Sequence, residues 1–171
     1  MHKRSLESIN EPYRTLVHKL LQELLKAFGD SLVSFVIYGS VARGEAKKDS
    51  DLDILLVIEH LPKSRFERLN LFSKAEEGLE PLLNKLLDEG YGIALSPIMK
   101  SKEEASRMSP LYLDMVEDSV IIYDEGEFFK NILQRLKKRL DELGAERIWI
   151  GKKWYWRLKK EFKPGEVIVI E

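Results

Sequence analysis

Apolar residues recur along the chain at two spacings, and these spacings predict where helices and strands lie. Between Asn10 and Gly29 they recur every three or four positions, as on a helix with one buried face. Asn10 is predicted to cap this helix, Pro12 suits its first turn and Gly29 can end it. Residues 32–38 and 52–59 are instead nearly continuous apolar runs, so both predict strands, the second in the interior of a sheet.

The second half of the chain continues this alternation of helices and strands. Residues 64–89 predict a helix that is broken near Gly78 and Pro81. Residues 91–100 predict a third strand, in which Pro97 implies a sheet edge, a bulge or an early end. The remaining predicted elements, in chain order, are a helix begun by a capping box of Ser101 and Glu104, a helix over 111–118, a strand over 120–124, a helix over 127–143, and short strands over 148–150, 154–158 and 167–170.

These elements predict the α/β (α+β) class, with a small mixed β-sheet flanked by helices. Residues 1–125 are expected to form the main domain. Residues 126–171 are expected to form a C-terminal helix and a basic, aromatic short-strand extension that packs on that domain.

The composition excludes several classes of protein. With 171 residues, of which 44% are apolar, the chain can form one compact core. It has no cysteine, which excludes disulfides, thiolate metal sites and a thiol nucleophile. It has no run of 18 apolar residues, and its start lacks the apolar stretch of a signal peptide, so a cytoplasmic protein is predicted. The charged fraction of 33% favours a heat-adapted source.

The residues that indicate chemistry lie between positions 38 and 57. Gly39 and Ser40 follow the first strand where a short helix is predicted, and backbone amides at such a start attract anions such as phosphate. Asp51 and Asp53 are two positions apart at the start of the second strand. Period-two geometry places both carboxylates on one face, where they can share a hard cation. Together these features predict a site for a magnesium-bound nucleoside triphosphate.

Each half of this motif also has a simpler interpretation. A single Gly-Ser turn is usually only a turn, and an Asp-x-Asp pair at a strand start is often a solvated cap. The two occur within one twenty-residue unit between strands, and this combination favours the site. A P-loop is excluded because Glu45 stands where that motif requires lysine after Gly44. The three histidines show no metal-ligand spacing.

The sequence GSVARGEAKKDSDLDILLV resembles the signature of the polymerase-beta-like nucleotidyltransferase superfamily. It is most similar to the small prokaryotic members called minimal nucleotidyltransferases (MNT). The matching positions are Gly39, Ser40, Ala42, Gly44, Ser50, Asp51 and Asp53.

This resemblance implies the nucleotidyltransferase fold and the transfer of AMP from MgATP to a hydroxyl group. It implies that Gly39 and Ser40 hold the triphosphate, that Asp51 and Asp53 ligate Mg²⁺ and carry catalysis, and that Ser50 braces the turn before them. Arg43 can reach a phosphate or serve a structural role. The resemblance also implies a helical HEPN-type protein as partner, with the chain acting as an antitoxin. Adenylylation of a small antibiotic is a weaker alternative.

The chain departs from the family pattern on the third strand, where catalytic members carry a further acid. Ala94 and Ser96 stand near the expected place. Either an acid from elsewhere completes the site, or only one metal ion is held well and turnover is slow or absent. The candidate acids are Glu103, Glu104, Asp114 and Glu117. A catalytically inactive, partner-binding nucleotide protein is therefore the alternative function.

The last part of the chain is basic and aromatic. Eleven Lys or Arg and four Asp or Glu lie between residues 135 and 163, interleaved with three tryptophans. This pattern fits single-stranded nucleic acid, which stacks on aromatic rings. The simpler interpretation, which we favour, is that the tryptophans pack a strand pair onto the domain. A third is that the surface steers phosphates towards the cleft.

Overall fold

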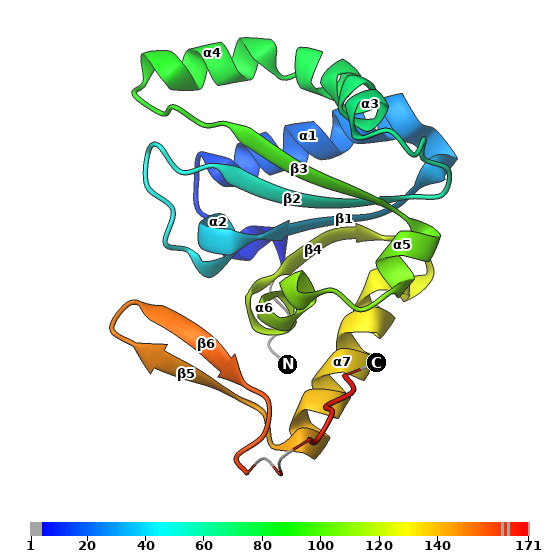
Figure 1. The fold of residues 1–171 in the computed structure, drawn as a ribbon. Helices are drawn as coiled ribbons and strands as arrows, with labels where there is room; N and C mark the ends of the chain where they lie inside the picture. Colours follow the sequence, from blue (N-terminus) through cyan, green and yellow to red (C-terminus); the bar gives the residue numbers. More distant parts are fainter. Residues whose placement is uncertain (1–4, 162, 164, 171) are drawn as a thin grey trace.

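The computed structural model describes residues 5–161, 163 and 165–170, and is built around a four-stranded mixed sheet. The strands are ordered β3-β2-β1-β4, with β1 antiparallel to both β2 and β4, and β2 parallel to β3 (Figure 1). Their bounds are Leu32–Tyr38 for β1, Leu52–Ile58 for β2, Leu95–Ser101 for β3 and Val120–Asp124 for β4. The predicted small mixed sheet flanked by helices is confirmed.

Helices cover both faces of this sheet (Figure 1). On one face lie α1 (Tyr13–Phe28), α3 (Arg65–Glu77) and α4 (Glu80–Asp88). On the other lie α5 (Lys102–Ser106), α6 (Pro110–Asp118) and α7 (Phe128–Leu143). The short elements are α2 (Gly39–Arg43), η1 (Leu6–Ser8), η2 (Gly29–Ser31) and η3 (Glu125–Glu127).

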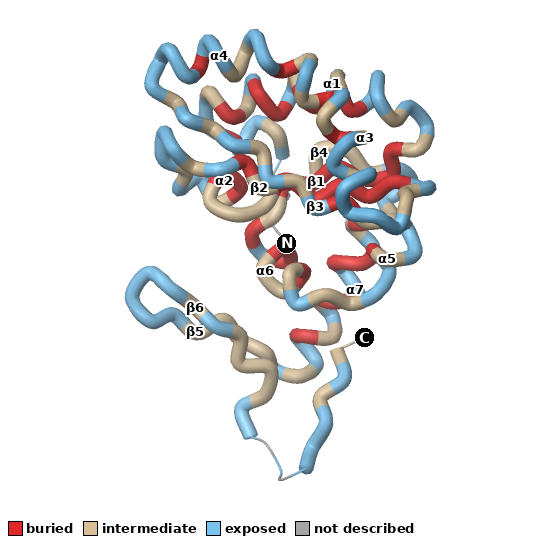
Figure 2. The backbone as a smooth tube through the Cα atoms, turned by 45° about the horizontal axis from the view of Figure 1, so that its top comes forward, coloured by how far each residue is buried: buried red, intermediate tan, exposed pale blue. Residues whose placement is uncertain are grey.

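The central strands are largely buried (Figure 2). Their alternate side chains enter two separate cores. From β2, Leu52 and Ile54 enter the core beneath α1, as the strand period predicts. Leu55 and Val57 enter the core shared with α6 and α7. The face of β2 that carries Asp53 is therefore the α6 side of the sheet.

Most predicted boundaries are confirmed, but the third strand, predicted over 91–100, begins only at Leu95. The break near Gly78 separates α3 from α4, and β3, which contains Pro97, is an edge strand. The capping box of Ser101 and Glu104 is present.

Two local predictions are wrong. Asn10 does not cap α1: Pro12 holds the cap position, and the Glu11 carboxylate accepts the Thr15 N–H at 3.1 Å in place of a cap side chain. The described residues of 165–170 form no strand. There the Val169 carbonyl accepts a hydrogen bond from Arg139 of α7 instead of from a neighbouring strand.

Arg68 ties α3 to the edge of the sheet. Its Nε donates to the Pro62 carbonyl at 2.6 Å, and its Nη1 donates to the Met99 carbonyl at 3.1 Å. The two Nη atoms also bind both carboxylate oxygens of Glu104, at 2.7 and 2.8 Å. The hydrogen bonds from Arg68 lower the pKa of Glu104 to about 2.

We expect Glu104→Gln to lower the free energy of unfolding at pH 7 by about 1 kcal/mol, since the pair is only partly shielded from water. The folded-state pKa lies below the unfolded value, so the contribution is complete above about pH 4.5 and is lost as the pH falls towards 2. Urea unfolding across this range measures the change. Glu103→Gln, which breaks an exposed pair with Arg107, is the matched control and should have almost no effect. Equal effects of the two substitutions would contradict the assignment.

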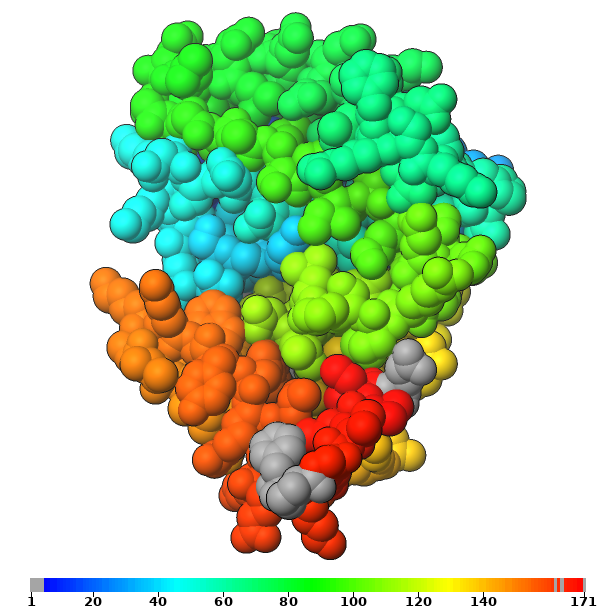
Figure 3. All heavy atoms as spheres, in the orientation of Figure 1, coloured from blue at the N-terminus to red at the C-terminus, as the bar shows by residue number. Residues whose placement is uncertain are grey.

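The C-terminal segment forms a hairpin of β5 (Glu146–Ile150) and β6 (Lys153–Arg157), as predicted. Figure 3 shows this hairpin directly below the segment around residues 40–50. A helix long and apolar enough to cross a membrane is not found among the described residues.

Candidate active site

The register between β1 and β2 places Gly39 against Asp53. Tyr38, the last residue of β1, pairs with Asp53, and Gly39 follows with a φ of 70°. A Cβ atom at Gly39 would lie 2.1 Å from Oδ2 of Asp53. Two features of this position therefore require glycine. Its backbone conformation is one that other residues rarely adopt, and the Asp53 carboxylate occupies the space that a side chain would need.

Helix α2 begins at this glycine and is fixed by two buried side chains and by a glycine at its C-terminal end. Val41 and Ala42 are buried beneath it, and Gly44 ends it in the left-handed conformation, with its N–H donating to the carbonyls of Ser40 and Val41. The helix has only five residues, so its dipole is small and any affinity for anions rests on its individual amide groups. Ser40 and Arg43 are partly buried on its surface, and the Arg43 side chain is 19% exposed.

The loop that leads to the carboxylates is braced by a tyrosine from α1. Ser50 Oγ accepts the Lys47 N–H at 2.8 Å, which closes the turn before Asp51. The Tyr13 hydroxyl donates to the carbonyls of Lys47, at 2.6 Å, and of Ser50, at 3.0 Å. Ser50 therefore has the geometry that its expected bracing role requires. The contribution of Tyr13 was missed because its apolar spacing identified it only as a core residue.

Asp51 and Asp53 lie at the start of β2, the first exposed and the second half-buried. The pKa of Asp53 is raised mainly by burial and further by repulsion from Asp51, and the positive charge of Arg43 opposes this shift. Burial, with a contribution from Asp53, also raises the pKa of Tyr38 to about 12. The charges of Asp51, Asp53 and Arg43 therefore interact at the start of β2.

Ser96 occupies the position on the third strand where an acid would complete the site. It pairs directly with Asp53 in the parallel register of β2 and β3. The described residues contain no group of three His, Cys, Asp or Glu side chains that could hold a metal ion. The four candidate acids have other partners: Glu103 binds Arg107, Glu104 binds Arg68, Asp114 binds two indoles and Glu117 binds Lys137. Among the described residues, the carboxylates available at this site are therefore those of Asp51 and Asp53.

A sequence profile of the nucleotidyltransferase domain family matches residues 17–150. The chain belongs to this family. The family predicted from the Gly-Ser and Asp-x-Asp motif is thereby confirmed, and with it the class of enzyme, a nucleotidyltransferase.

Known relatives of this nucleotidyltransferase include archaeal proteins. A protein of Methanocaldococcus jannaschii, provisionally named a protein adenylyltransferase, is 32% identical over 84% of this chain and 92% of its own. The protein adenylyltransferase MntA of Thermococcus cleftensis is 42% identical over 39% of this chain and 61% of its own.

Solved structures with a weaker likeness include two toxin–antitoxin complexes. One, determined with AMP-PNP, is 16% identical and covers 74% of this chain and 91% of its own, with a TM-score of 0.44. The other holds a tri-AMPylated HEPN toxin of Shewanella oneidensis with its MNT antitoxin. It is 14% identical and covers 76% of this chain and 92% of its own, with a TM-score of 0.41.

The nucleotidyltransferase site has the donor set for one magnesium ion. Mg²⁺ is usually bound by one or two carboxylates together with substrate phosphates, rather than by an all-protein cage. Asp51 and Asp53 provide these carboxylates, and the absence of a side chain at Gly39 lets the Asp53 carboxylate lie directly against the turn that precedes Ser40. The residues present therefore fit a single ion shared with a nucleotide.

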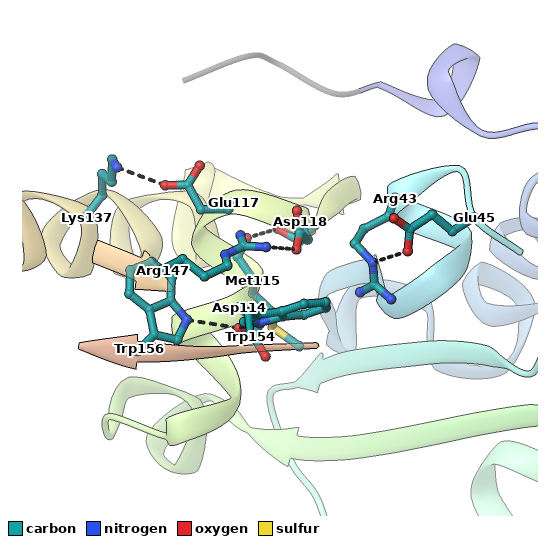
Figure 4. A network of polar contacts seen from close by, with 11 residues as sticks. Arg43, Glu45, Asp114, Met115, Glu117, Asp118, Lys137, Arg147, Trp154 and Trp156 are labelled. Carbon is teal, nitrogen blue, oxygen red and sulfur yellow. Dashed lines mark hydrogen bonds and ion pairs between the residues drawn. The ribbon is translucent and has the colours of Figure 1, made fainter. Parts of the chain in front are cut away.

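Two of the three tryptophans of the C-terminal hairpin, Trp154 and Trp156, contact the nucleotidyltransferase domain, whereas Trp149 is 53% exposed (Figure 4). The indole N–H groups of Trp154 and Trp156 both donate to Oδ1 of Asp114 on α6, at 2.8 and 2.9 Å. Arg147 of β5 forms an ion pair with the buried Asp118 at 2.6 Å. These contacts favour the packing interpretation over a surface for nucleic acid. The sequence offered no signal for Asp114 and Asp118 as their partners.

Proposed function

We propose that this nucleotidyltransferase transfers AMP from MgATP to a hydroxyl group of a protein partner. The observation that supports it most directly is the contact of Gly39 with Asp53, beside Asp51, because a phosphate bound at the glycine turn would then lie next to the two carboxylates proposed to hold magnesium. The protein adenylyltransferase names of the two archaeal relatives support AMP as the transferred group.

In this proposal Gly39 and Ser40 receive the triphosphate and Arg43 adds a positive charge beside it. Asp51 and Asp53 hold Mg²⁺, which when bound neutralises the phosphates and orients pyrophosphate for departure. The acceptor hydroxyl loses its proton to solvent and its oxygen forms a bond to the α-phosphorus, as the bond from that phosphorus to the pyrophosphate oxygen breaks. Ser50 keeps the two carboxylates at the strand start through its hydrogen bond from the Lys47 N–H.

For the partner we propose a HEPN-type protein, with this chain acting as the antitoxin. The proposal follows from the resemblance of the motif around Gly39 and Asp53 to the minimal nucleotidyltransferases.

The test is to incubate the protein with magnesium and ATP labelled at the α-phosphate, together with a purified HEPN-type protein or cell extract. Transfer of the α-label to protein, without transfer of a γ-label, is expected from the wild type and not from Asp51→Asn. Transfer of the γ-label would contradict nucleotidyl transfer, since it indicates a phosphoryl group.

A second candidate function is a nucleotide-binding protein that does not catalyse transfer. The presence of Ser96 opposite Asp53, in place of a third acid, favours it. Magnesium-dependent ATP binding by the wild type without any transfer of α-label would select this function.

A further inference from the structure

Helix α2 contacts the C-terminal hairpin through Arg43 and Trp154. The guanidinium carbon of Arg43, on α2, lies 4.9 Å from the centre of the Trp154 ring, on β6 (Figure 4). This distance is within the range of an attractive cation–π interaction, and tryptophan is the strongest partner for it.

Arg43 follows Gly39 by one helical turn, so both residues lie on the same side of α2. Its Nε donates to Glu45 at 2.8 Å, and its guanidinium carbon lies over the Trp154 ring. The two terminal nitrogens have no hydrogen-bond partner within the described part of the chain. Arg43 is therefore restrained at one nitrogen and one face, while the two groups that bind phosphate best remain available.

Trp154 is itself held in place by several contacts. Its N–H donates to Asp114, and its ring lies 4.9 Å from the ring of Trp149. The guanidinium of Arg147 lies 5.1 Å from its centre and is fixed in turn by Asp118. A side chain with this many partners provides a rigid support for Arg43.

We propose that the hairpin completes the nucleotide site, with Trp154 as a positioning residue that presents Arg43 to the triphosphate. This inference depends on the proposed function for the presence of a triphosphate. Trp154 lies beyond residues 17–150, so the family match does not supply this element. A free arginine side chain loses rotamer entropy when it binds phosphate, and a side chain that is already restrained loses less.

The test measures binding of a non-hydrolysable ATP analogue with magnesium, and of AMP, to the full-length protein. For the analogue we expect Trp154→Leu to weaken affinity about fivefold and Arg43→Ala about tenfold. The double variant should bind like Arg43→Ala, because Trp154 acts through Arg43. Trp154→Phe should restore most of the affinity, and AMP binding should change little in every variant.

Tyr155→Leu is the matched control, since Tyr155 is the next residue on β6 and is 50% exposed. It should bind the analogue like the wild type. If Trp154→Leu also binds like the wild type, or if its effect adds fully to that of Arg43→Ala, the inference is wrong. If Trp154→Leu does not fold, Trp154→Gln, whose side-chain N–H can still donate to Asp114 but which has no aromatic ring, and its double variant with Arg43→Ala decide by the same criterion. A wild type that does not bind the analogue refutes the proposed function instead.

Discussion

Asp53→Asn should lower AMP transfer by at least about a hundredfold while the protein stays folded, since removal of one positioned charge-stabilising group costs about 10²–10³ in rate. Asp53 follows Asp51 by two positions and is half-buried at the strand start, where its carboxylate contacts the Gly39 turn. The amide keeps the shape of the side chain and removes its charge, so the magnesium site is weakened without a new cavity. Transfer of α-label and near-UV circular dichroism measure the two effects.

The same substitution should raise the stability of the metal-free protein at neutral pH. Burial and repulsion from Asp51 raise the pKa of Asp53, so the folded state holds this proton more tightly than the unfolded state. The ionised carboxylate therefore destabilises the folded protein once the pH rises above its folded-state pKa, and this cost disappears as the pH falls and the group is protonated. Thermal unfolding of Asp53→Asn and wild type should differ at pH 7 and converge in acid.

Asp49→Asn is the matched control, because Asp49 is an exposed acid of the same loop outside the site. It should preserve both activity and stability. A loss of stability in Asp53→Asn at neutral pH would show that this carboxylate has a structural role and that the site assignment is wrong.

Gly39→Ala should inactivate the enzyme and destabilise it by roughly 3 kcal/mol, from backbone strain together with overpacking. The new Cβ would lie 2.1 Å from Oδ2 and 3.0 Å from Cγ of Asp53, at a φ of 70°. To avoid this clash, the Asp53 side chain would have to rotate away from residue 39. The metal site would then be lost even in protein that remains folded. Urea unfolding and the transfer assay measure these effects.

Gly44→Ala separates the steric contact from the backbone effect. Gly44 has a φ of 76°, and its added Cβ would meet only Asn10 Nδ2, at 3.7 Å. It should therefore cost about 1 kcal/mol of backbone strain and leave AMP transfer largely intact. When Asp53 is also replaced by alanine, Gly39→Ala should lower the free energy of unfolding by only about 1 kcal/mol, as Gly44→Ala does. An equal loss of activity in the two glycine variants would contradict a specific contact with Asp53.

The arrangement of helices and strands could be predicted because each element has its own local signal. The apolar spacing up to Gly29, the capping box at Ser101 and Pro97 on an edge strand depend on residues close to one another in the chain. The errors, at Asn10 and in residues 167–170, fall where Glu11 or Arg139 provides a competing hydrogen bond. Local patterns do not reveal such a competition.

The residues of the candidate site differ in the same way in how far they could be predicted from the sequence. Gly39, Ser50 and Asp53 could be selected from the sequence because strand pairing joins two segments separated by one short loop. The identity of the residue opposite Asp53 on β3 depended on the register of a parallel strand that follows two intervening helices. The sequence narrowed it to Ala94 or Ser96, and the structure shows that it is Ser96.

The sequence by itself therefore determined the family, the order of the elements and the pair of carboxylates, because these are encoded in residues near one another. The tertiary structure alone decided that no third acid joins Asp51 and Asp53 among the described residues, and that Trp154 supports Arg43. Both depend on contacts between distant segments. Such contacts follow from how the helices and the hairpin pack on the α6 side of the sheet, which the periodicity of a single segment does not specify.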